Sequence, residues 1–227
     1  MSNVLIEVKN ISKVYRTPGA EVSVKALNEV SLSFEKGEFA AIAGPSGSGK
    51  STLLNIIGTI DTPSAGEVLY EGRRVFAMSE NELADFRLRS LGFIFQAYNL
   101  IKVLTAVENV EYVLALQGVA QPERSRRALD ALTMVDLAPQ ADRRPDLLSG
   151  GQQQRVAVAR AIVHRPMIVL ADEPTANLDS KTADSLMELM SRLNEENGVT
   201  FLFSSHDPRV LSRAKRVIRI QDGVLGR

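Results

Sequence analysis

The stretch Gly44-Pro45-Ser46-Gly47-Ser48-Gly49-Lys50-Ser51-Thr52 places the strongest constraint on how this chain folds. It matches the pattern G-x-x-x-x-G-K-S/T, which holds nucleotide phosphates on backbone N–H groups, a lysine and a hydroxyl. The pattern requires a strand before the loop and a helix after it. The apolar run Phe39–Ala43 leads directly into the loop, and residues 50–60 are predicted to form the helix.

Each residue type in this loop has a chemical reason to be there. Gly44, Gly47 and Gly49 let the backbone approach the phosphates closely. Lys50 supplies a point charge for the β- and γ-phosphates, and Ser51 offers a hydroxyl to Mg²⁺. Loops of this kind serve many ATPases and GTPases, so the motif alone predicts only a nucleotide ligand.

Three short apolar runs predict the core of the fold. They are Phe39–Ala43, Met167–Ala171 and Val199–Phe203, each bounded by turn or polar residues. Continuous apolar runs of this length favour strands covered on both faces, as in a parallel sheet. The fold class is therefore α/β.

Two other parts of the chain have different patterns. Leu5–Val8, Val30–Phe34 and Glu67–Tyr70 read as strands of an antiparallel sheet beside the parallel core, the last as one arm of a hairpin. Residues 105–117, 122–135 and 152–164 read as helices. His164, at the end of the last helix, is interpreted as a residue favourable to the helix dipole.

The composition excludes several function classes. At 227 residues the chain is long enough for one domain of generous size. Lys and Arg total 27, Asp and Glu also total 27, and this balance gives no broad electrostatic reason to bind nucleic acid. There is no cysteine for a disulfide or thiolate metal site. No apolar run approaches the length of a membrane span, so any membrane role requires another chain to cross the bilayer.

Two acidic residues follow the second apolar run. Asp172 and Glu173 come at the carboxyl end of a predicted buried strand, and in parallel sheets this is the edge where ligands bind. Acids at a strand end are in many proteins simply solvated. Together with the phosphate loop, they point instead to a role in a ligand site at this edge of the sheet.

A second glycine turn, Leu148-Ser149-Gly150-Gly151-Gln152, precedes a predicted helix. Such a turn also offers backbone donors and a helix N-terminus to an anion. A helix start capped by Ser149 is the plainer interpretation, but it does not explain the whole motif.

With both glycine motifs in one sequence, the chain resembles the ATP-binding subunit of ABC (ATP-binding cassette) transporters over essentially its whole length. The resemblance implies a P-loop NTPase (RecA-like) parallel-sheet core with an N-terminal antiparallel β-subdomain and an inserted α-helical subdomain. It implies a single domain over residues 1–227, with the helical subdomain at about residues 97–164. It also implies ATP and Mg²⁺ as ligands, and ATP hydrolysis as the activity.

The resemblance assigns roles to individual residues of this sequence. Asp172 resembles the Mg²⁺-binding acid and Glu173 the general base, with Lys50 as the phosphate-binding lysine. Gln96 matches a glutamine that senses Mg²⁺ and the γ-phosphate, and His206 matches a histidine that hydrogen-bonds the γ-phosphate. Tyr15 is the candidate for stacking on adenine, with core packing as the alternative.

The resemblance also implies a homodimer that sandwiches two ATP molecules. In the family, the turn matching Ser149, Gly150, Gly151 and Gln152 reaches the γ-phosphate of ATP held by another copy. The stretch Asn177-Leu178-Asp179 resembles a loop that crosses the dimer interface. Asp179 is in addition a candidate helix cap, and the two interpretations are compatible.

Longer segments resemble one branch of the family, the ATPases that serve macrolide-export and lipoprotein-release permeases. The resemblance rests on residues 57–63, 91–100, 104–110 and 170–179. Ser64-Ala65 and Ser204-Ser205 depart from the branch pattern. The branch implies an integral-membrane permease as partner and a peripheral location on the cytoplasmic face of the cell membrane. The alternative is the ATPase of a membrane-bound signalling or cell-wall-remodelling complex that translocates nothing.

Overall fold

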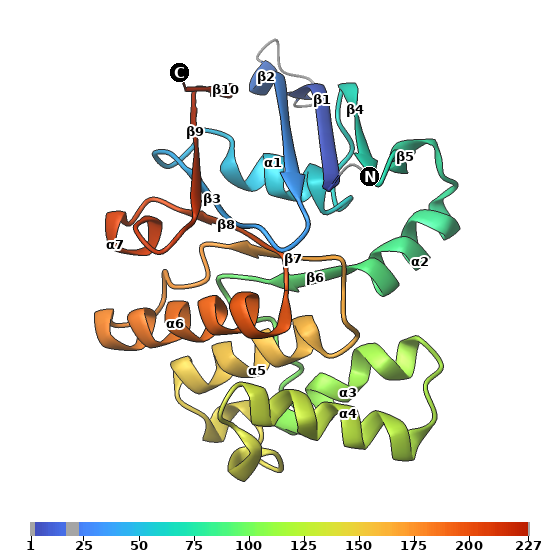
Figure 1. Ribbon diagram of the computed structural model, residues 1–227, viewed down its shortest axis with the longest axis vertical. Coiled ribbons are helices and arrows are strands. Elements are labelled where there is room, and N and C mark those ends of the chain that lie inside the picture. The colour runs from blue at the N-terminus through green and yellow to red at the C-terminus, as the bar shows by residue number, and fades with distance from the viewer. Residues whose placement is uncertain (1–2, 17–22, 227) are drawn as a thin grey trace.

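The computed structural model describes residues 3–16 and 23–226. A six-stranded sheet crosses the middle of the molecule, with a four-stranded sheet above it and helices below it in the view of Figure 1. The helix that follows the phosphate loop, α1 (Lys50–Ile57), lies between the two sheets. This arrangement confirms the predicted α/β architecture with a separate antiparallel sheet.

The six-stranded sheet has the strand order β10-β9-β3-β8-β7-β6, and all neighbours are parallel except β10 and β9. The strands are β3 (Phe39–Ala43), β6 (Leu91–Ile94), β7 (Ile168–Asp172), β8 (Phe201–Ser205), β9 (Arg216–Gln221) and β10 (Val224–Leu225). Because β3, β7 and β8 are parallel neighbours, the residues that follow them meet at one edge of the sheet.

The central strands are apolar throughout because both faces of the sheet are covered. All five residues of β3 are buried. Phe39 and Ala41 join the core that contains α3 to α6, whereas Ala40 and Ile42 join the core that contains α1 and the antiparallel sheet. Successive side chains of a strand point to opposite faces, so each face needs its own apolar cover.

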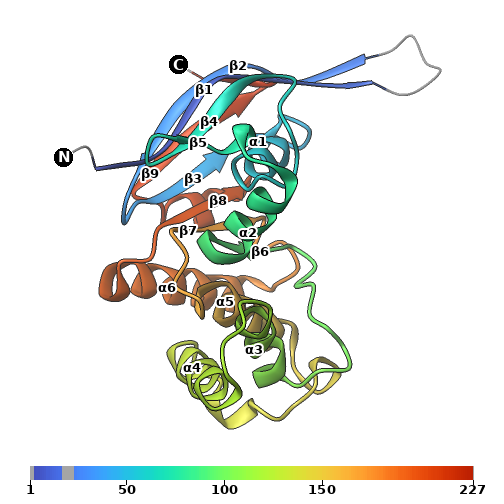
Figure 2. The same ribbon diagram turned by 90° about the vertical axis from the view of Figure 1, so that its right-hand side faces the viewer.

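The four-stranded sheet has the order β2-β1-β4-β5, and every neighbouring pair is antiparallel. Its strands are β1 (Val4–Arg16), β2 (Ser23–Glu35), β4 (Ala65–Tyr70) and β5 (Arg73–Arg74). The buried Tyr70 hydroxyl donates to the carbonyl of Ile57 and ties β4 to the end of α1. The outer position of this sheet is clearest in Figure 2.

The helical part consists of α3 (Ala106–Leu116), α4 (Gln121–Met134) and α5 (Gly150–Ile162), which pack on one another away from the antiparallel sheet. Capping boxes start α3 at Thr105 and α5 at Ser149. The remaining elements are α2 (Glu80–Ser90), α6 (Ser180–Asn197), α7 (Pro208–Leu211) and the 3-10 turns η1 (Val75–Ala77), η2 (Ala138–Gln140) and η3 (Pro145–Leu147). Among the described residues, no helix combines the length and apolar character needed to cross a membrane.

Several predicted boundaries were wrong by a few residues. The helix after the phosphate loop ends at Ile57 rather than at residue 60, because Thr59 has a left-handed backbone (φ 54°). The N–H of Gly58 still donates to the carbonyl of Leu54, but the helical hydrogen-bond pattern stops there. Helix α5 begins two residues before the predicted position, since the glycines of the second turn already belong to it.

Candidate functional site

A cavity of about 700 Å³ opens beside the phosphate loop. It brings together residues from the loop, from the ends of the parallel strands and from β2. Its lining is Val24, Lys25, Ala26, Pro45, Ser46, Gly47, Gly49, Lys50, Ser51, Thr52, Gln96, Glu173, Ala176, His206, Asp222 and Gly223. Most of the residues predicted for phosphate binding and catalysis therefore share one site.

The phosphate loop is held tightly against strand β9. A Cβ atom at Gly44 would lie 2.2 Å from the carbonyl oxygen of Ile220, so no side chain fits there. Gly49 adopts φ 106° as the residue preceding α1, a conformation that L side chains rarely adopt. Within the loop, the carbonyl of the buried Ser48 accepts from the N–H of Gly223.

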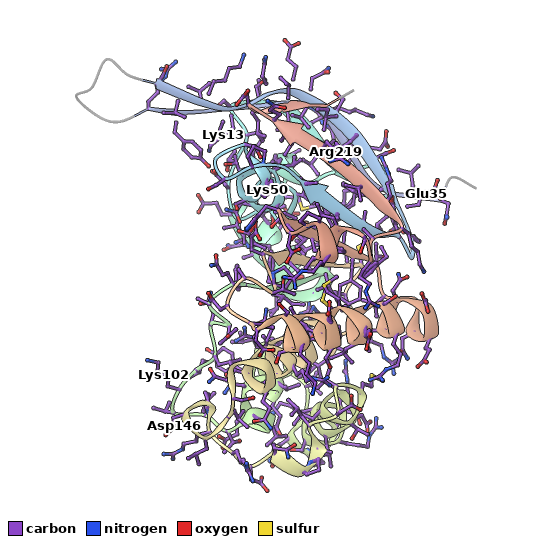
Figure 3. All side chains as sticks on the ribbon, turned by 90° about the vertical axis from the view of Figure 1, so that its left-hand side faces the viewer. Lys13, Glu35, Lys50, Lys102, Asp146 and Arg219 are labelled. Carbon is purple, nitrogen blue, oxygen red and sulfur yellow. The ribbon has the colours of Figure 1, made fainter. Side chains whose placement is uncertain are left out.

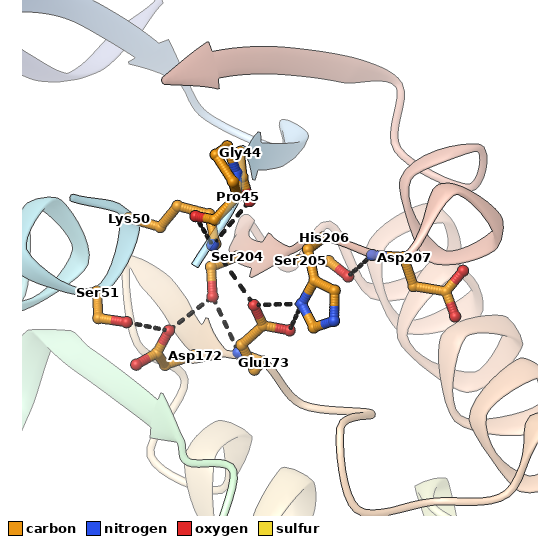
Figure 4. Close-up of polar contacts among 10 residues, drawn as sticks. All are labelled: Gly44, Pro45, Lys50, Ser51, Asp172, Glu173, Ser204, Ser205, His206 and Asp207. Carbon is orange, nitrogen blue, oxygen red and sulfur yellow. Dashed lines mark hydrogen bonds and ion pairs between the residues drawn. The ribbon is translucent and has the colours of Figure 1, made fainter. Parts of the chain in front are cut away.

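Lys50 is the buried cation of the site. Its Nζ donates to the carbonyl oxygens of Gly44 at 2.9 Å and Pro45 at 3.0 Å, and lies 3.7 Å from Glu173 Oε1. The side chain thus lies back along its own loop, with its charge near the carboxylate of Glu173, which directly follows β7 (Figure 4). Buried lysines are rare unless paired, and these contacts meet that requirement.

Ser51, Asp172 and Ser204 form a chain of hydrogen bonds. Ser51 Oγ donates to Asp172 Oδ1 at 3.0 Å, and Ser204 Oγ donates to the same oxygen at 2.6 Å. The Ser204 hydroxyl also accepts from the backbone N–H of Glu173 at 2.9 Å. The strand β8 therefore fixes both acidic residues at the end of β7.

Glu173 lies between two nitrogen groups. His206 Nδ1 is 3.0 Å and 3.1 Å from its two carboxylate oxygens, and Lys50 Nζ is on its other side. The Glu173 backbone has φ 46°, a left-handed value that is uncommon for a residue other than glycine. Strained backbone of this kind is concentrated at functional sites, where surrounding bonds hold it in place.

Two side-chain amides, one on α5 and one in the loop before α6, bind the backbone beside the site. Gln154, fully buried on α5, donates from Nε2 to the carbonyl of Pro174 at 2.6 Å and to that of Phe95 at 3.5 Å. Asn177 Nδ2 donates to the carbonyl of Gln96 at 2.9 Å. Both amides thus bind backbone carbonyls beside residues whose side chains line the cavity.

None of Ser149, Gly150, Gly151 and Gln152 lines the cavity within this chain. Ser149 Oγ accepts from Gln152 N, and Gln152 Oε1 accepts from Ser149 N, which completes the capping box of α5. A Cβ at Gly151 would lie 2.4 Å from Thr182 Cγ2. The capping interpretation of Ser149 is therefore confirmed, and the turn packs closely against the start of α6.

Asp179 and Tyr15 also lie outside the cavity lining. Asp179 caps α6 by accepting from the N–H and hydroxyl of Thr182, and these bonds lower the pKa of its carboxyl. Tyr15 lies beside the cavity, because its partner across the β1–β2 ladder is Val24, which lines it. Its side chain is partly exposed rather than part of the core.

Sequence reasoning missed several residues of the site. Val24, Lys25 and Ala26 reach the cavity only through strand pairing, for which the sequence gives no local signal. Asp222 and Gly223 also line the cavity and were not among the predicted site residues, and Ser204 was identified only as a departure from a family pattern. The described residues contain no group of three or more His, Cys, Asp or Glu side chains that could hold a metal.

The interpretation of His164 as a residue favourable to the helix dipole was wrong. His164 is buried, and its Nε2 lies 3.1 Å from the carbonyl of Leu91 in β6. Burial lowers the pKa of His164, although the contact with Leu91 opposes this effect. The residue is a neutral link between α5 and the edge of the sheet.

The fold and the cavity define a nucleotide-binding protein with a phosphate loop. Comparison with known families is consistent with this class: residues 27–176 match the ABC transporter family. The chain is 48% identical over 219 residues to an uncharacterized ABC transporter ATP-binding protein of Methanocaldococcus jannaschii (MJ1508), with 96% of each chain covered. It is 44% identical over 223 residues to the macrolide export ATP-binding/permease protein MacB of Syntrophobacter fumaroxidans, of which it covers 31%.

A solved structure gives the same result. The dimeric ATP-binding cassette MJ0796, from the same archaeon and bound to ADP and Pi, superposes with a TM-score of 0.89. That comparison has 44% identity and covers 98% of this chain and 97% of the other. The chain therefore belongs to the ABC transporter family and is an ATP-binding subunit with the ABC ATPase fold. The relatives favour this function over a signalling complex without transport.

Proposed function

We propose that this subunit binds ATP with Mg²⁺ in the cavity, hydrolyses the ATP, and thereby drives a separate permease of the macrolide-export or lipoprotein-release type. The observation that carries the proposal is the meeting of Lys50, Ser51, Asp172 and Glu173 at one edge of the parallel sheet. The relatives that include a macrolide export protein support the choice of branch.

The donor set beside Ser51 fits Mg²⁺. This ion prefers oxygen ligands and is commonly held by one or two carboxylates together with substrate phosphates. Ser51 Oγ and Asp172 Oδ1 are already 3.0 Å apart, and the Gln96 side chain lines the same cavity. We assign these three residues to the ion. When bound, Mg²⁺ supplies positive charge that stabilises the phosphate oxygens.

The remaining groups have separate tasks. Backbone N–H groups of the phosphate loop and the Lys50 ammonium bind the β- and γ-phosphates. Glu173 takes a proton from the attacking water, and His206, on the far side of the carboxylate, donates a hydrogen bond to the γ-phosphate. Tyr15, beside Val24 at the rim, stacks on the adenine ring.

The second glycine turn completes the site from another copy of the chain. Ser149 and the glycines lie outside the cavity of their own chain, and the N-terminus of α5 is suited to bind an anion. A two-fold homodimer would place this turn against the ATP of its partner, with two identical sites. The solved structures of the related cassette MJ0796 are dimeric, which supports this arrangement.

The helical part is proposed to transmit this chemistry to the permease. We treat residues 1–227 as one domain whose helical subdomain, about residues 97–164, moves as a unit. A cavity of about 440 Å³ lies between residues 97–102 and 145–153, and Val103 and Leu147 beside it are 72% and 64% exposed. Apolar side chains this exposed suit a permease segment, so the subunit acts peripherally at the cytoplasmic face of the membrane.

The catalytic assignment is tested with Glu173→Gln and Lys50→Ala. Glu173→Gln keeps a carbonyl oxygen for His206 but loses the base, so we expect ATP binding with turnover reduced about 10²–10⁴-fold. Lys50→Ala should weaken binding itself. Wild-type turnover by Glu173→Gln would remove Glu173 from the catalytic role.

Sharing of sites is tested by mixing Lys50→Ala with Ser149→Arg. Neither homodimer has an intact site, whereas a heterodimer carries both lesions in one site and none in the other. Activity should therefore recover in part on mixing. No recovery, with heterodimers shown to form, would count against shared sites.

Permease docking is tested with Val103→Asp and Leu147→Asp, assayed by co-purification from detergent-solubilised membranes. Leu129→Asp, an exposed apolar residue of α4, is the matched control. Tyr98 and Leu100 line the same cavity but are less suitable for this test than Val103 and Leu147. Leu100 packs on the core and the Tyr98 hydroxyl lies against Gly150, so changing either risks the fold. Retention of the permease by both exposed variants would place docking elsewhere.

A further inference from the structure

Three side chains form a cluster at the rim of the cavity: Lys13 and Tyr15 on β1, and Asp61 in the connection after α1. The Tyr15 hydroxyl donates to Asp61 Oδ2 at 2.7 Å. Lys13 Nζ donates to Asp61 Oδ1 at 2.5 Å and to the carbonyl of Thr62 at 2.7 Å. The Lys13 ammonium also lies 4.8 Å from the centre of the Tyr15 ring. We call these three residues the tyrosine cluster.

The tyrosine cluster lies next to the nucleotide cavity without lining it. Tyr15 faces Val24 across the β1–β2 ladder, and its hydroxyl interacts with Thr52 at the start of α1. Val24 and Thr52 both line the cavity. Figure 3 shows Lys13 on the side of the molecule that carries Lys50. The tyrosine ring therefore stands beside the phosphate loop, 43% exposed.

Two charged groups contact Tyr15: the Asp61 carboxylate at its hydroxyl and the Lys13 ammonium at one face of its ring. Partial burial works to raise the pKa of Asp61, but the hydrogen bonds from Lys13 and Tyr15 outweigh it, and the pKa lies below its ordinary value. Burial and the bond to Asp61 raise the pKa of Tyr15, so its hydroxyl keeps the proton that it donates. The ammonium over the ring adds a cation–π contact.

We propose that Asp61 and Lys13 are positioning residues for the base of ATP: they fix the Tyr15 ring at the cavity rim in the orientation that adenine stacks on. This inference rests on the proposed role of Tyr15 in adenine binding. Asp61 fixes the phenolic end of the ring, and Lys13 covers one face, so the base stacks on the part that stays exposed. A ring held in place in advance loses less freedom when the base binds.

The expected effect is on affinity rather than turnover. Ordering one side chain on binding lowers affinity by about twofold to tenfold, so Asp61→Ala should raise the Kd for ATP by about that factor. Removing the ring altogether in Tyr15→Ala should raise it further, by about fivefold to a hundredfold, since base–aromatic stacking contributes more. For Asp61→Ala we expect a change in Kd rather than in the kcat at saturating ATP, because Asp61 does not line the cavity.

The experiment compares binding of ATP with binding of inorganic tripolyphosphate, which has no base. Kd values are measured for Asp61→Ala, Asp61→Asn, Tyr15→Phe, Tyr15→Ala and the double variant Asp61→Ala/Tyr15→Ala. Asp85→Asn, which breaks a surface ion pair on α2, is the control. Thermal melting monitors the fold, and Tyr15→Phe tests the same contact if Asp61→Ala fails to fold.

Three results support the proposal together. Asp61→Ala and Tyr15→Phe weaken ATP binding but leave tripolyphosphate binding unchanged, and Asp61→Ala adds nothing when Tyr15 is already alanine. If Tyr15→Ala weakens ATP binding while Asp61→Ala and Tyr15→Phe do not, the positioning role of Asp61 is overturned. The stacking of adenine on Tyr15 is then still supported. Equal weakening of ATP and tripolyphosphate overturns it as well, since the effect would then be a distorted phosphate loop. If Tyr15→Ala binds ATP as tightly as wild type does, the proposed stacking of adenine on Tyr15 is itself wrong.

Discussion

Ser204 is the residue whose removal most directly tests how the acidic pair is held. It is fully buried on β8, and its hydroxyl makes two hydrogen bonds, one donated to Asp172 and one accepted from the N–H of Glu173. Ser204→Ala deletes one oxygen and leaves the strand otherwise unchanged. The N–H of Glu173 then has no partner from β8, and the carboxylate of Asp172 loses a donor.

The magnitude follows from these two contacts. A partly buried N–H left unpaired costs about 1–3 kcal/mol, and a hydrogen bond to a charged group contributes about 1.5–3 kcal/mol. Since one hydroxyl makes both bonds, we expect the free energy of unfolding to fall by roughly 2–4 kcal/mol. Glu173 also loses a bond that holds its left-handed backbone, so kcat should fall about tenfold or more, because small misplacements of a catalytic group are costly.

The assay is urea unfolding together with the rate of ATP hydrolysis across a Mg²⁺ titration. Ser205→Ala is the matched control, because Ser205 is the next residue of the same strand and equally buried, but its hydroxyl accepts from Asp207 N instead. Equal stability and equal kcat in the two variants would refute the argument that Ser204 holds the acidic pair.

Two further predictions concern α5 and the turn that follows it. Gln154→Leu keeps the volume but leaves the carbonyl of Pro174 unpaired, so the free energy of unfolding should fall by about 1–3 kcal/mol, and an unchanged urea midpoint would contradict this. His164 has a pKa lowered chiefly by burial, so its stabilising contribution is full above the unfolded value near pH 6.5 and is lost as the pH falls below it. The melting temperature of the wild type should therefore fall more steeply below pH 6.5 than that of His164→Gln, and parallel curves would count against the assignment.

The central strands and the phosphate loop were predictable because their signals are local. The run Phe39–Ala43 is apolar throughout since two cores cover it, and the loop that follows is defined by its own glycines and lysine. Helix α2 was not predicted, because none of its residues is fully buried and its apolar side chains Leu83 and Phe86 pack on the core only in part. The signals available in the sequence were its capping box, Ser79 with Glu82, and the acidic first turn and basic last turn.

The parts of the site that sequence reasoning missed depend on pairing between distant segments. Val24 reaches the cavity because β2 pairs with β1, and Ser204 reaches Asp172 because β8 lies beside β7. Neither pairing has a local sequence signature. The error on His164 has the same origin, since its burial depends on contact with β6.

The hydrogen bonds around the cavity hold the backbone in place and leave side chains to line the cavity. Gln154 and Asn177 bind the carbonyls of Pro174, Phe95 and Gln96, which flank or belong to residues that line the cavity. The backbone at these points is therefore tied to α5 and to the loop before α6, while the side chains of Gln96 and Glu173 stay directed into the cavity. Because α5 begins at the second glycine turn, Gln154 connects the helix that carries this turn to the segment beside Glu173.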